Sequence, residues 1–264
     1  MAMLAMLGLL ILAVLINLLH IVLGLSRQGS WGITLAVFAA ILAVAGYAIK
    51  NRWDGVFIDK DNRISLSRFQ LILWTMILVS ALFTAGLTNF LLANPPPPAP
   101  PLPGPLAINI PPQIWALLGL GAFTAVAAPA ITDGKRGAAG VAAAGGGGGA
   151  ASHRDKTAAA VKEAQNLTAP AVFDGRVMTK AETTDARWVD LIMGDYEGSA
   201  YVDASKLQKL AFTILLATLY SAQLWRLMAG STFIGDFPPV NEGFLALLAI
   251  SHAAYLADKQ IAST

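Results

Sequence analysis

Two stripes of polar side chains, each on a predicted helix, are the residues of this chain best placed to do chemistry. The first stripe consists of Gln70, Ser80, Thr84 and Thr88. The second consists of Gln208, Thr218 and Arg226. With 3.6 residues per turn, the members of each stripe fall within about 80° of one another on one helix face. Such faces could line a water-filled path, and a path of hydroxyls and amides without a carboxylate would conduct passively.

The same residues also fit a packing role. Ser, Thr and Gln in membrane helices often hydrogen-bond to a neighbouring helix, at roughly 0.6 kcal/mol each. Ser and Thr can also bond back to their own helix. The sequence alone leaves both interpretations open.

Catalytic and metal-binding patterns are missing from the sequence. There is no cysteine, and the three histidines, His20, His153 and His252, have no acidic or histidine partner at helical spacing. His252 lies inside an apolar run, where an ionisable group is a functional candidate, although a neutral histidine bonded to a neighbouring helix is the alternative. The sequence therefore predicts a non-enzymatic protein without a cofactor or metal.

Composition indicates a membrane protein. Apolar residues make up 56% of the chain and charged residues only 13%, against about 25% charged residues in a soluble domain. A helix needs about 20 apolar residues to cross a bilayer. Six stretches fit: 3–25, 31–49, 66–91, 112–131, 205–227 and 243–257. The predicted fold is all-α and integral to the membrane, with six transmembrane helices.

The distribution of Lys and Arg predicts the orientation. Basic residues gather after the second span, after the fourth span and in the tail, whereas the opposite loops hold only Arg27 and Arg226. Because basic loops stay in the cytoplasm, we expect both termini in the cytoplasm of a bacterial inner membrane. The basic segments mix with acids, as in Asp59–Arg63, and lack stacking aromatics, so they do not indicate nucleic-acid binding.

The chain contains one two-span unit twice. Residues 67–75 read Ser-Arg-Phe-Gln-Leu-Ile-Leu-Trp-Thr, and residues 205–213 read Ser-Lys-Leu-Gln-Lys-Leu-Ala-Phe-Thr. Each copy is followed by a Pro-Pro pair and a second apolar run. We therefore expect an N-terminal hairpin followed by two parallel-repeat hairpins.

Four segments follow from this reading. Residues 1–50 form the N-terminal hairpin, and residues 51–132 form the first repeat with an external polyproline loop at 94–105. Residues 133–202 are a cytoplasmic Gly/Ala-rich linker with a short interfacial helix near 185–194. Residues 203–264 form the second repeat.

At these repeated motifs the chain resembles a set of bacterial polytopic membrane proteins that carry a similar pair of hairpins. Their second helices resemble Leu-Leu-Gly-Ile-Ser followed by small residues and Thr. Here the copies read Leu-Leu-Gly-Leu-Gly-Ala-Phe-Thr at 117–124 and Leu-Leu-Ala-Ile-Ser-His-Ala-Ala at 247–254. The resemblance covers about half the chain and implies the duplicated fold but no activity.

Three functions remain open from the sequence. The first is a subunit of an oligomeric passive channel lined by the polar faces of spans three and five. The second is a structural anchor or scaffold subunit in a larger membrane assembly. The third is a small-solute transporter, which the absence of carboxylates from the apolar spans disfavours. The expected partners are the lipid bilayer and either further copies of the chain or other subunits of a membrane complex.

Overall fold

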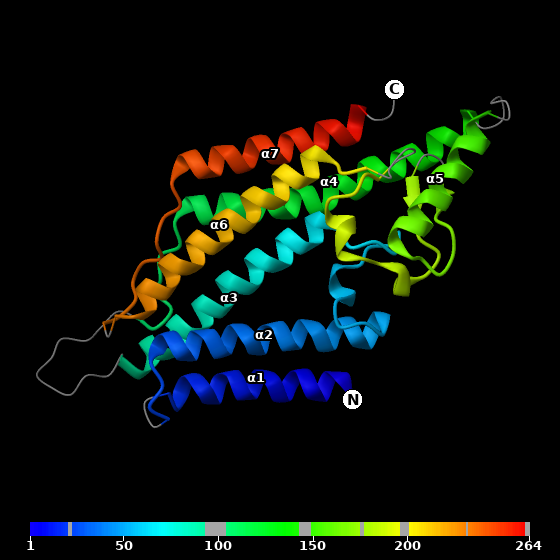
Figure 1. The fold of residues 1–264 in the computed structure, drawn as a ribbon. Helices are drawn as coiled ribbons and strands as arrows, with labels where there is room; N and C mark the ends of the chain where they lie inside the picture. Colours follow the sequence, from blue (N-terminus) through cyan, green and yellow to red (C-terminus); the bar gives the residue numbers. More distant parts are fainter. Residues whose placement is uncertain are drawn as a thin grey trace, which may run out of the picture. The chain divides into compact units, whose positions relative to one another are not determined.

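The computed structural model describes residues 1–20, 23–92, 104–142, 149–174, 177–195, 201–230 and 232–261 (Figure 1). Most of the predicted polyproline loop (94–103) and part of the Gly/Ala linker (143–148) lie outside these residues. The α-helices are α1 (Ala2–Leu18), α2 (Arg27–Lys50), α3 (Leu66–Leu92), α4 (Pro112–Ala142), α5 (Gly149–Gln165), α6 (Ala204–Met228) and α7 (Glu242–Ile261). Short 3₁₀ helices are η1 (Gly55–Phe57), η2 (Thr183–Asp185) and η3 (Trp188–Leu191).

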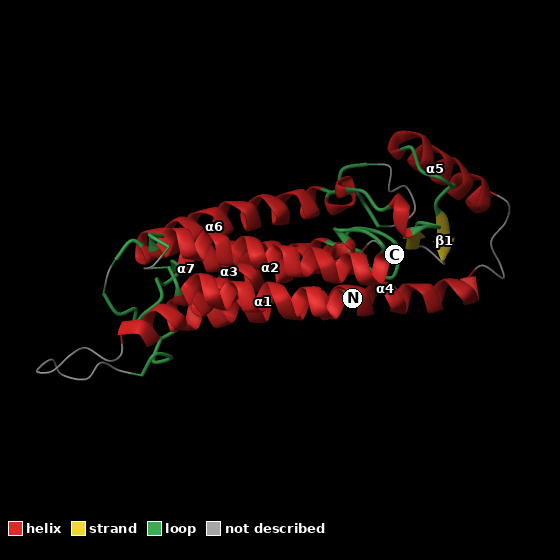
Figure 2. Ribbon diagram, turned by 90° about the horizontal axis from the view of Figure 1, so that it is seen from below, coloured by secondary structure: helices red, strands yellow, loops and turns green. Residues whose placement is uncertain are grey.

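Helices dominate the described chain, as Figure 2 shows. Its strands form one antiparallel hairpin, β1 (Val172–Asp174) and β2 (Val177–Thr179). Four helical stretches are long and apolar enough to cross a membrane: Arg27–Lys50, Leu66–Leu92, Pro112–Gly134 and Ala204–Met228. The chain is therefore a helical protein suited to a membrane, as its composition predicted.

The chain divides into two compact units. The first comprises Met1–Val56, Ile72–Leu118 and Leu215–Leu245. The second comprises Phe57–Leu71, Gly119–Ile214 and Ala246–Thr264. The boundary falls within α3, α4, α6 and α7, so each of these helices contributes residues to both units.

In the first unit, α1 and α2 lie side by side as an antiparallel hairpin (Figure 1). Ser26 caps α2, because its hydroxyl accepts a hydrogen bond from Gly29 N at 3.0 Å. Asn17 joins the two helices by donating to Thr34 Oγ1 at 2.7 Å, and Thr34 in turn bonds back to Ser30 O. Pairing these buried groups removes the cost of leaving them without partners.

Aromatic side chains connect other helices of the first unit. Trp31 on α2 donates its indole N–H to Ser80 Oγ on α3 at 3.1 Å, and its ring lies 6.2 Å from that of Trp225 on α6. Trp74 on α3 and Tyr220 on α6 lie 6.1 Å apart. Aromatic pairs at such distances add about 0.5–1.5 kcal/mol beyond their burial.

In the first unit, the two segments that precede the Pro-Pro pairs form backbone hydrogen bonds with each other. Asn109 N donates to Gly235 O at 2.7 Å, and Phe237 N donates to Asn109 O at 3.0 Å. The result is a parallel bridge between Asn109 and Asp236. Each of these residues stands two positions before its proline pair.

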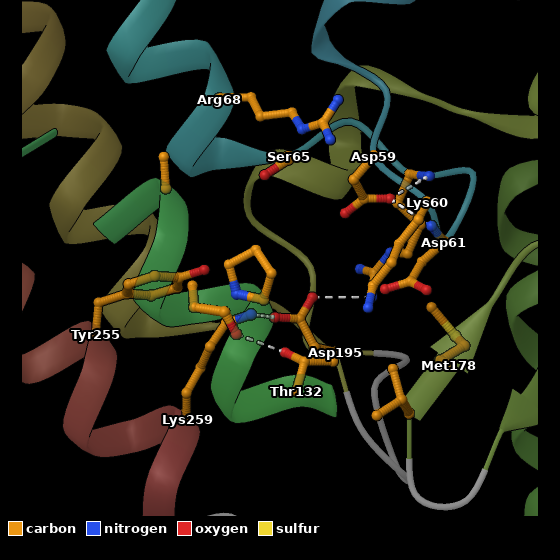
Figure 3. A pocket seen from close by; sticks show the side chains of 15 residues that line it. Asp59, Lys60, Asp61, Ser65, Arg68, Thr132, Met178, Asp195, Tyr255 and Lys259 are labelled. Atoms are coloured by element: carbon orange, nitrogen blue, oxygen red, sulfur yellow. Dashed lines mark hydrogen bonds and ion pairs between the residues drawn. The ribbon is translucent and has the colours of Figure 1, made fainter. Parts of the chain in front are cut away.

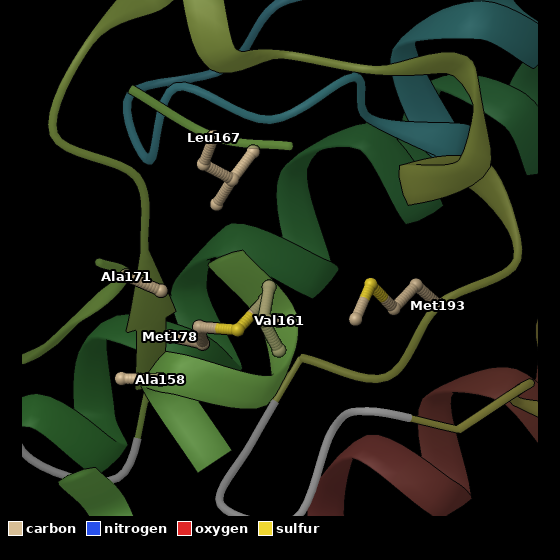
Figure 4. Close-up of a cluster of buried hydrophobic side chains, with 6 residues drawn as sticks. All are labelled: Ala158, Val161, Leu167, Ala171, Met178 and Met193. Atoms are coloured by element: carbon tan, nitrogen blue, oxygen red, sulfur yellow. The ribbon is translucent and has the colours of Figure 1, made fainter. Parts of the chain in front are cut away.

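Two apolar cores hold the second unit together. One contains Ala158, Val161, Leu167, Ala171, Met178 and Met193 (Figure 4). The other contains Ile58, Ile64, Leu66, Ala186 and Leu191, with Phe57 and Phe69 packed against it. In the region predicted as an interfacial helix, the structure forms η3, whose Trp188 and Val189 are exposed while Leu191 is buried.

Candidate functional site

In the second unit, one carboxylate is surrounded by three cations. Asp195 accepts a hydrogen bond from Arg63 Nη1 at 2.9 Å and forms an ion pair with Lys259 Nζ at 2.8 Å (Figure 3). It also accepts a hydrogen bond from Lys206 Nζ at 2.5 Å. We call these four residues the Asp195 cluster. The cations come from the loop before α3, the first turn of α6 and the end of α7, so one side chain connects three distant segments. Arg63 also donates to Gly194 O and Lys206 to Met193 O, which fixes the backbone beside Asp195.

The electrostatics of the Asp195 cluster favour its charged form. Burial alone would raise the pKa of Asp195, but the charges on Lys206, Lys259 and Arg63 together hold this pKa well below its ordinary value. Burial likewise opposes the charge on Arg63, yet Asp195 and Asp190 raise the pKa of its guanidinium. Asp195 and Arg63 therefore stabilise each other's charged forms at neutral pH.

A cleft of about 130 Å³ opens beside the Asp195 cluster (Figure 3). Its charged lining comprises Asp59, Lys60, Asp61, Arg63, Arg68, Asp195 and Lys259. Ser65, Thr132 and Tyr255 add hydroxyl groups. Burial and the neighbouring Asp61 raise the pKa of Asp59. The cleft can therefore bind polar or ionic groups.

A second buried ion pair stabilises the loops around β2. Lys180 donates to both carboxylate oxygens of Asp190, at 2.8 and 3.0 Å, and both side chains are fully buried. Lys180 also donates to Gln165 Oε1 and to Asp185 O, so its ammonium group is fully used. Burial lowers the pKa of Lys180, against the opposing effect of Asp190. These contacts indicate a structural role.

The polar residues predicted on α3 are all buried. Gln70 donates to Thr213 Oγ1 of α6, and Ser80 accepts the bond from Trp31. Thr88 bonds back to Thr84 O at 2.9 Å, while the hydroxyl of Thr84 has no hydrogen-bond partner among the described residues. These contacts favour the packing interpretation for α3.

The polar residues predicted on α6 are placed differently. Gln208, Thr218 and Arg226 are all exposed on the surface of the single chain. The structure therefore does not bring the two predicted stripes together. The stripe on α3 is buried, whereas the stripe on α6 is exposed on the surface of the single chain. His252 on α7 is buried, and its Nδ1 has no hydrogen-bond partner within the described part of the chain.

Sequence reasoning missed the Asp195 cluster and the buried Lys209 of α6. Asp195 carries no local signal, because its partners lie 132, 11 and 64 positions away in the chain. Lys209 did carry a signal, since an ionisable residue inside an apolar span is a functional candidate by default. Lys209 has no counterpart in the first copy of the repeated motif, where the residue after the glutamine is Leu71.

Within the described ranges, no group of three or more His, Asp or Glu side chains is placed to hold a metal ion. The chain matches no protein-family model, and neither a curated protein nor a solved structure is significantly similar to it. Its function must therefore be argued from its own residues.

Proposed function

We propose that this chain is a non-enzymatic bacterial inner-membrane protein that crosses the bilayer six times, with both termini in the cytoplasm. Four spans are supported by the length and hydropathy of their helices. The 17-residue α1 and the 20-residue α7 complete the set, because at 1.5 Å per residue they extend about 26 and 30 Å. The excess of Lys and Arg in alternate connecting segments supports the orientation.

The pairing of Asn109 with Asp236 supports the duplicated arrangement. Two like-oriented hairpins would carry their Pro-Pro segments to the same side of the membrane, where they could pair in parallel. The bridge between Asn109 and Asp236 is parallel, and each residue stands two positions before a Pro-Pro pair, which supports this arrangement.

We further propose that the chain works as a subunit of an oligomeric passive channel. The observation that carries this proposal is the exposed polar face of α6, with Gln208, Thr218 and Arg226 open on the single chain. An amide, a hydroxyl and a guanidinium are costly next to lipid. They are accommodated when α6 helices of several copies face a shared aqueous passage. Gln70 of α3, which donates to Thr213 of α6, would support this helix from behind.

Flux through reconstituted vesicles tests the channel. Thr218→Trp should lower the flux of small ions or solutes at least tenfold, because an indole would obstruct the passage. Thr218→Ser keeps a small hydroxyl and should leave the flux close to that of the wild type. A wild-type protein that is silent in vesicles would contradict the channel, and so would equal flux in the two variants.

A scaffold is the second candidate, and the second unit provides the observation that favours it. A groove there is lined by Gln165, Arg187, Val189, Ile192, Met193, Tyr201 and Val202. Trp188, Val189, Tyr201 and Val202 are exposed on the single chain. A silent bilayer combined with a stable co-purifying partner, lost on Tyr201→Asp, would select this function over the channel.

A further inference from the structure

Lys209 is a buried basic residue that no carboxylate pairs with among the described residues. Its side chain is fully buried in α6, and its Nζ has no hydrogen-bond partner among the residues that the structure describes. Its nearest electron-rich neighbour is the ring of Tyr255, whose centroid lies 4.1 Å from Nζ. A cation–π contact offsets only part of the cost of burying an ammonium group, because that cost reaches several kcal/mol per ion.

No carboxylate accepts a hydrogen bond from Lys209 within the described residues, and Asp195 is paired with other cations. Asp195 holds Arg63, Lys206 and Lys259, and Lys206 and Lys259 both repel a charge at Lys209. Buried charges in proteins are normally paired or bound to an ion.

Unsatisfied polar atoms surround the same position. Gln70 contacts the backbone oxygen of Lys209, while its own Oε1 has no partner among the described residues. The same holds for Nδ1 of His252, which lies within electrostatic reach of Lys209. The hydroxyl of Ser67 lies within hydrogen-bond reach of Tyr255, beside the same position. Buried groups of this kind usually have an ion or water bound to them.

We infer that Lys209 binds a small monovalent inorganic anion of the chloride type. The Lys209 ammonium supplies the charge, and the Ser67 hydroxyl and an imidazole N–H of His252 supply further donors. Because Lys209 is fully enclosed, a halide suits the site better than a phosphate ester or a lipid headgroup. Tyr255 belongs both to this site and to the lining of the charged cleft, so the site adjoins the cleft. The inference goes beyond the proposed channel and does not depend on it.

Halide binding to the detergent-purified full chain tests the inference. Bromide is titrated against gluconate at constant ionic strength, and both direct binding and the unfolding temperature are measured. The wild type should bind bromide saturably, and its unfolding temperature should rise with the logarithm of bromide concentration. Lys209→Met should weaken bromide binding at least tenfold and abolish the thermal shift. The control Lys162→Met changes an exposed lysine of α5 and should behave like the wild type.

Loss of the charge at Lys209 should not unfold the protein, since it removes an unpaired buried cation. A folded Lys209→Met variant without halide binding therefore supports the site. Equal responses of the wild type to bromide and gluconate would overturn it, and so would bromide binding that survives Lys209→Met. Ser67→Ala offers a milder variant, expected to weaken binding by a smaller factor.

Discussion

At the scale of single residues, Asp195 is the shared counter-charge of three basic side chains. Asp195→Asn would leave Arg63, Lys206 and Lys259 without their shared counter-charge. Breaking a buried ion pair from one side costs about 3–5 kcal/mol, so we expect a loss of that size in the free energy of unfolding. Thermal or denaturant unfolding in detergent would measure it.

Asp133→Asn is the matched control, because Asp133 pairs with Lys60 while both side chains remain about half exposed. Exposed pairs contribute about 0–1 kcal/mol. Equal destabilisation by the two substitutions would contradict the role given to Asp195.

The lowered pKa of Asp195 also predicts a pH dependence. A carboxylate whose pKa is lower in the folded than in the unfolded state stabilises the fold fully above its ordinary pKa, about 3.9. That stabilisation is lost as the pH falls toward the folded-state pKa. Between about pH 5 and pH 3, the wild type should therefore lose more stability than Asp195→Asn. Parallel acid curves for the two proteins would argue against the ionised cluster.

Asn89 provides a second residue-scale prediction, in the first unit. Its amide donates to Ile234 O and accepts from Ile234 N, both at 2.9 Å. Asn89→Ala leaves both backbone groups unpaired and should cost about 2–3 kcal/mol of unfolding free energy. Asn109→Ala removes only an exposed side-chain bond, because the bridge of Asn109 uses its backbone, and should cost less than about 1 kcal/mol. The difference in unfolding free energy between the two variants decides the point.

At the scale of elements, a close backbone contact follows α2. A Cβ added to Gly55 would lie 2.6 Å from Gly46 O and 2.8 Å from Lys50 Cβ. Gly55→Ala should therefore destabilise the fold by about 1–3 kcal/mol, as overpacking does. Gly119 of α4 has no atom within 4 Å of such a Cβ, so Gly119→Ala should not lower the unfolding temperature. An unfolding temperature that is unchanged in Gly55→Ala would show that this contact is loose.

Helix positions were the most predictable part of the fold. The spans predicted at 66–91 and 205–227 correspond to Leu66–Leu92 and Ala204–Met228. They were predictable because a capping residue marks where each helix begins and the length of the apolar run marks where it ends. At α6 the capping residue is Asp203, whose carboxylate accepts hydrogen bonds from Ser205 N and Lys206 N. The first span was predicted at 3–25, whereas α1 ends at Leu18.

Contacts between distant residues were not predictable. Periodicity placed Gln70 and Gln208 in equivalent stripes, but it could not show that Gln70 meets Thr213 while Gln208 stays exposed. The same limit applies to Arg63 and Asp195, whose pairing depends on how the loops fold. Sequence pattern determines which face of a helix is polar, whereas tertiary packing determines what that face meets.

At the scale of the whole molecule, the exposed face of α6 predicts an oligomer. The mass of the detergent-purified protein, corrected for bound detergent, should be a small multiple of 27.6 kDa. Thr218→Trp, which changes that face, should alter the distribution of masses or block flux. A purely monomeric species at all concentrations would contradict the proposed assembly.

The membrane topology is the central claim, and the chain is well suited to testing it because it contains no cysteine. Single cysteines can replace the exposed residues Lys60, Glu182 and Ala107, and intact cells can then be treated with a membrane-impermeant maleimide. The six-span arrangement predicts labelling of Ala107→Cys in intact cells, and labelling of Lys60→Cys and Glu182→Cys only after permeabilisation. Labelling of Lys60→Cys and Glu182→Cys from opposite sides of the membrane would contradict the arrangement.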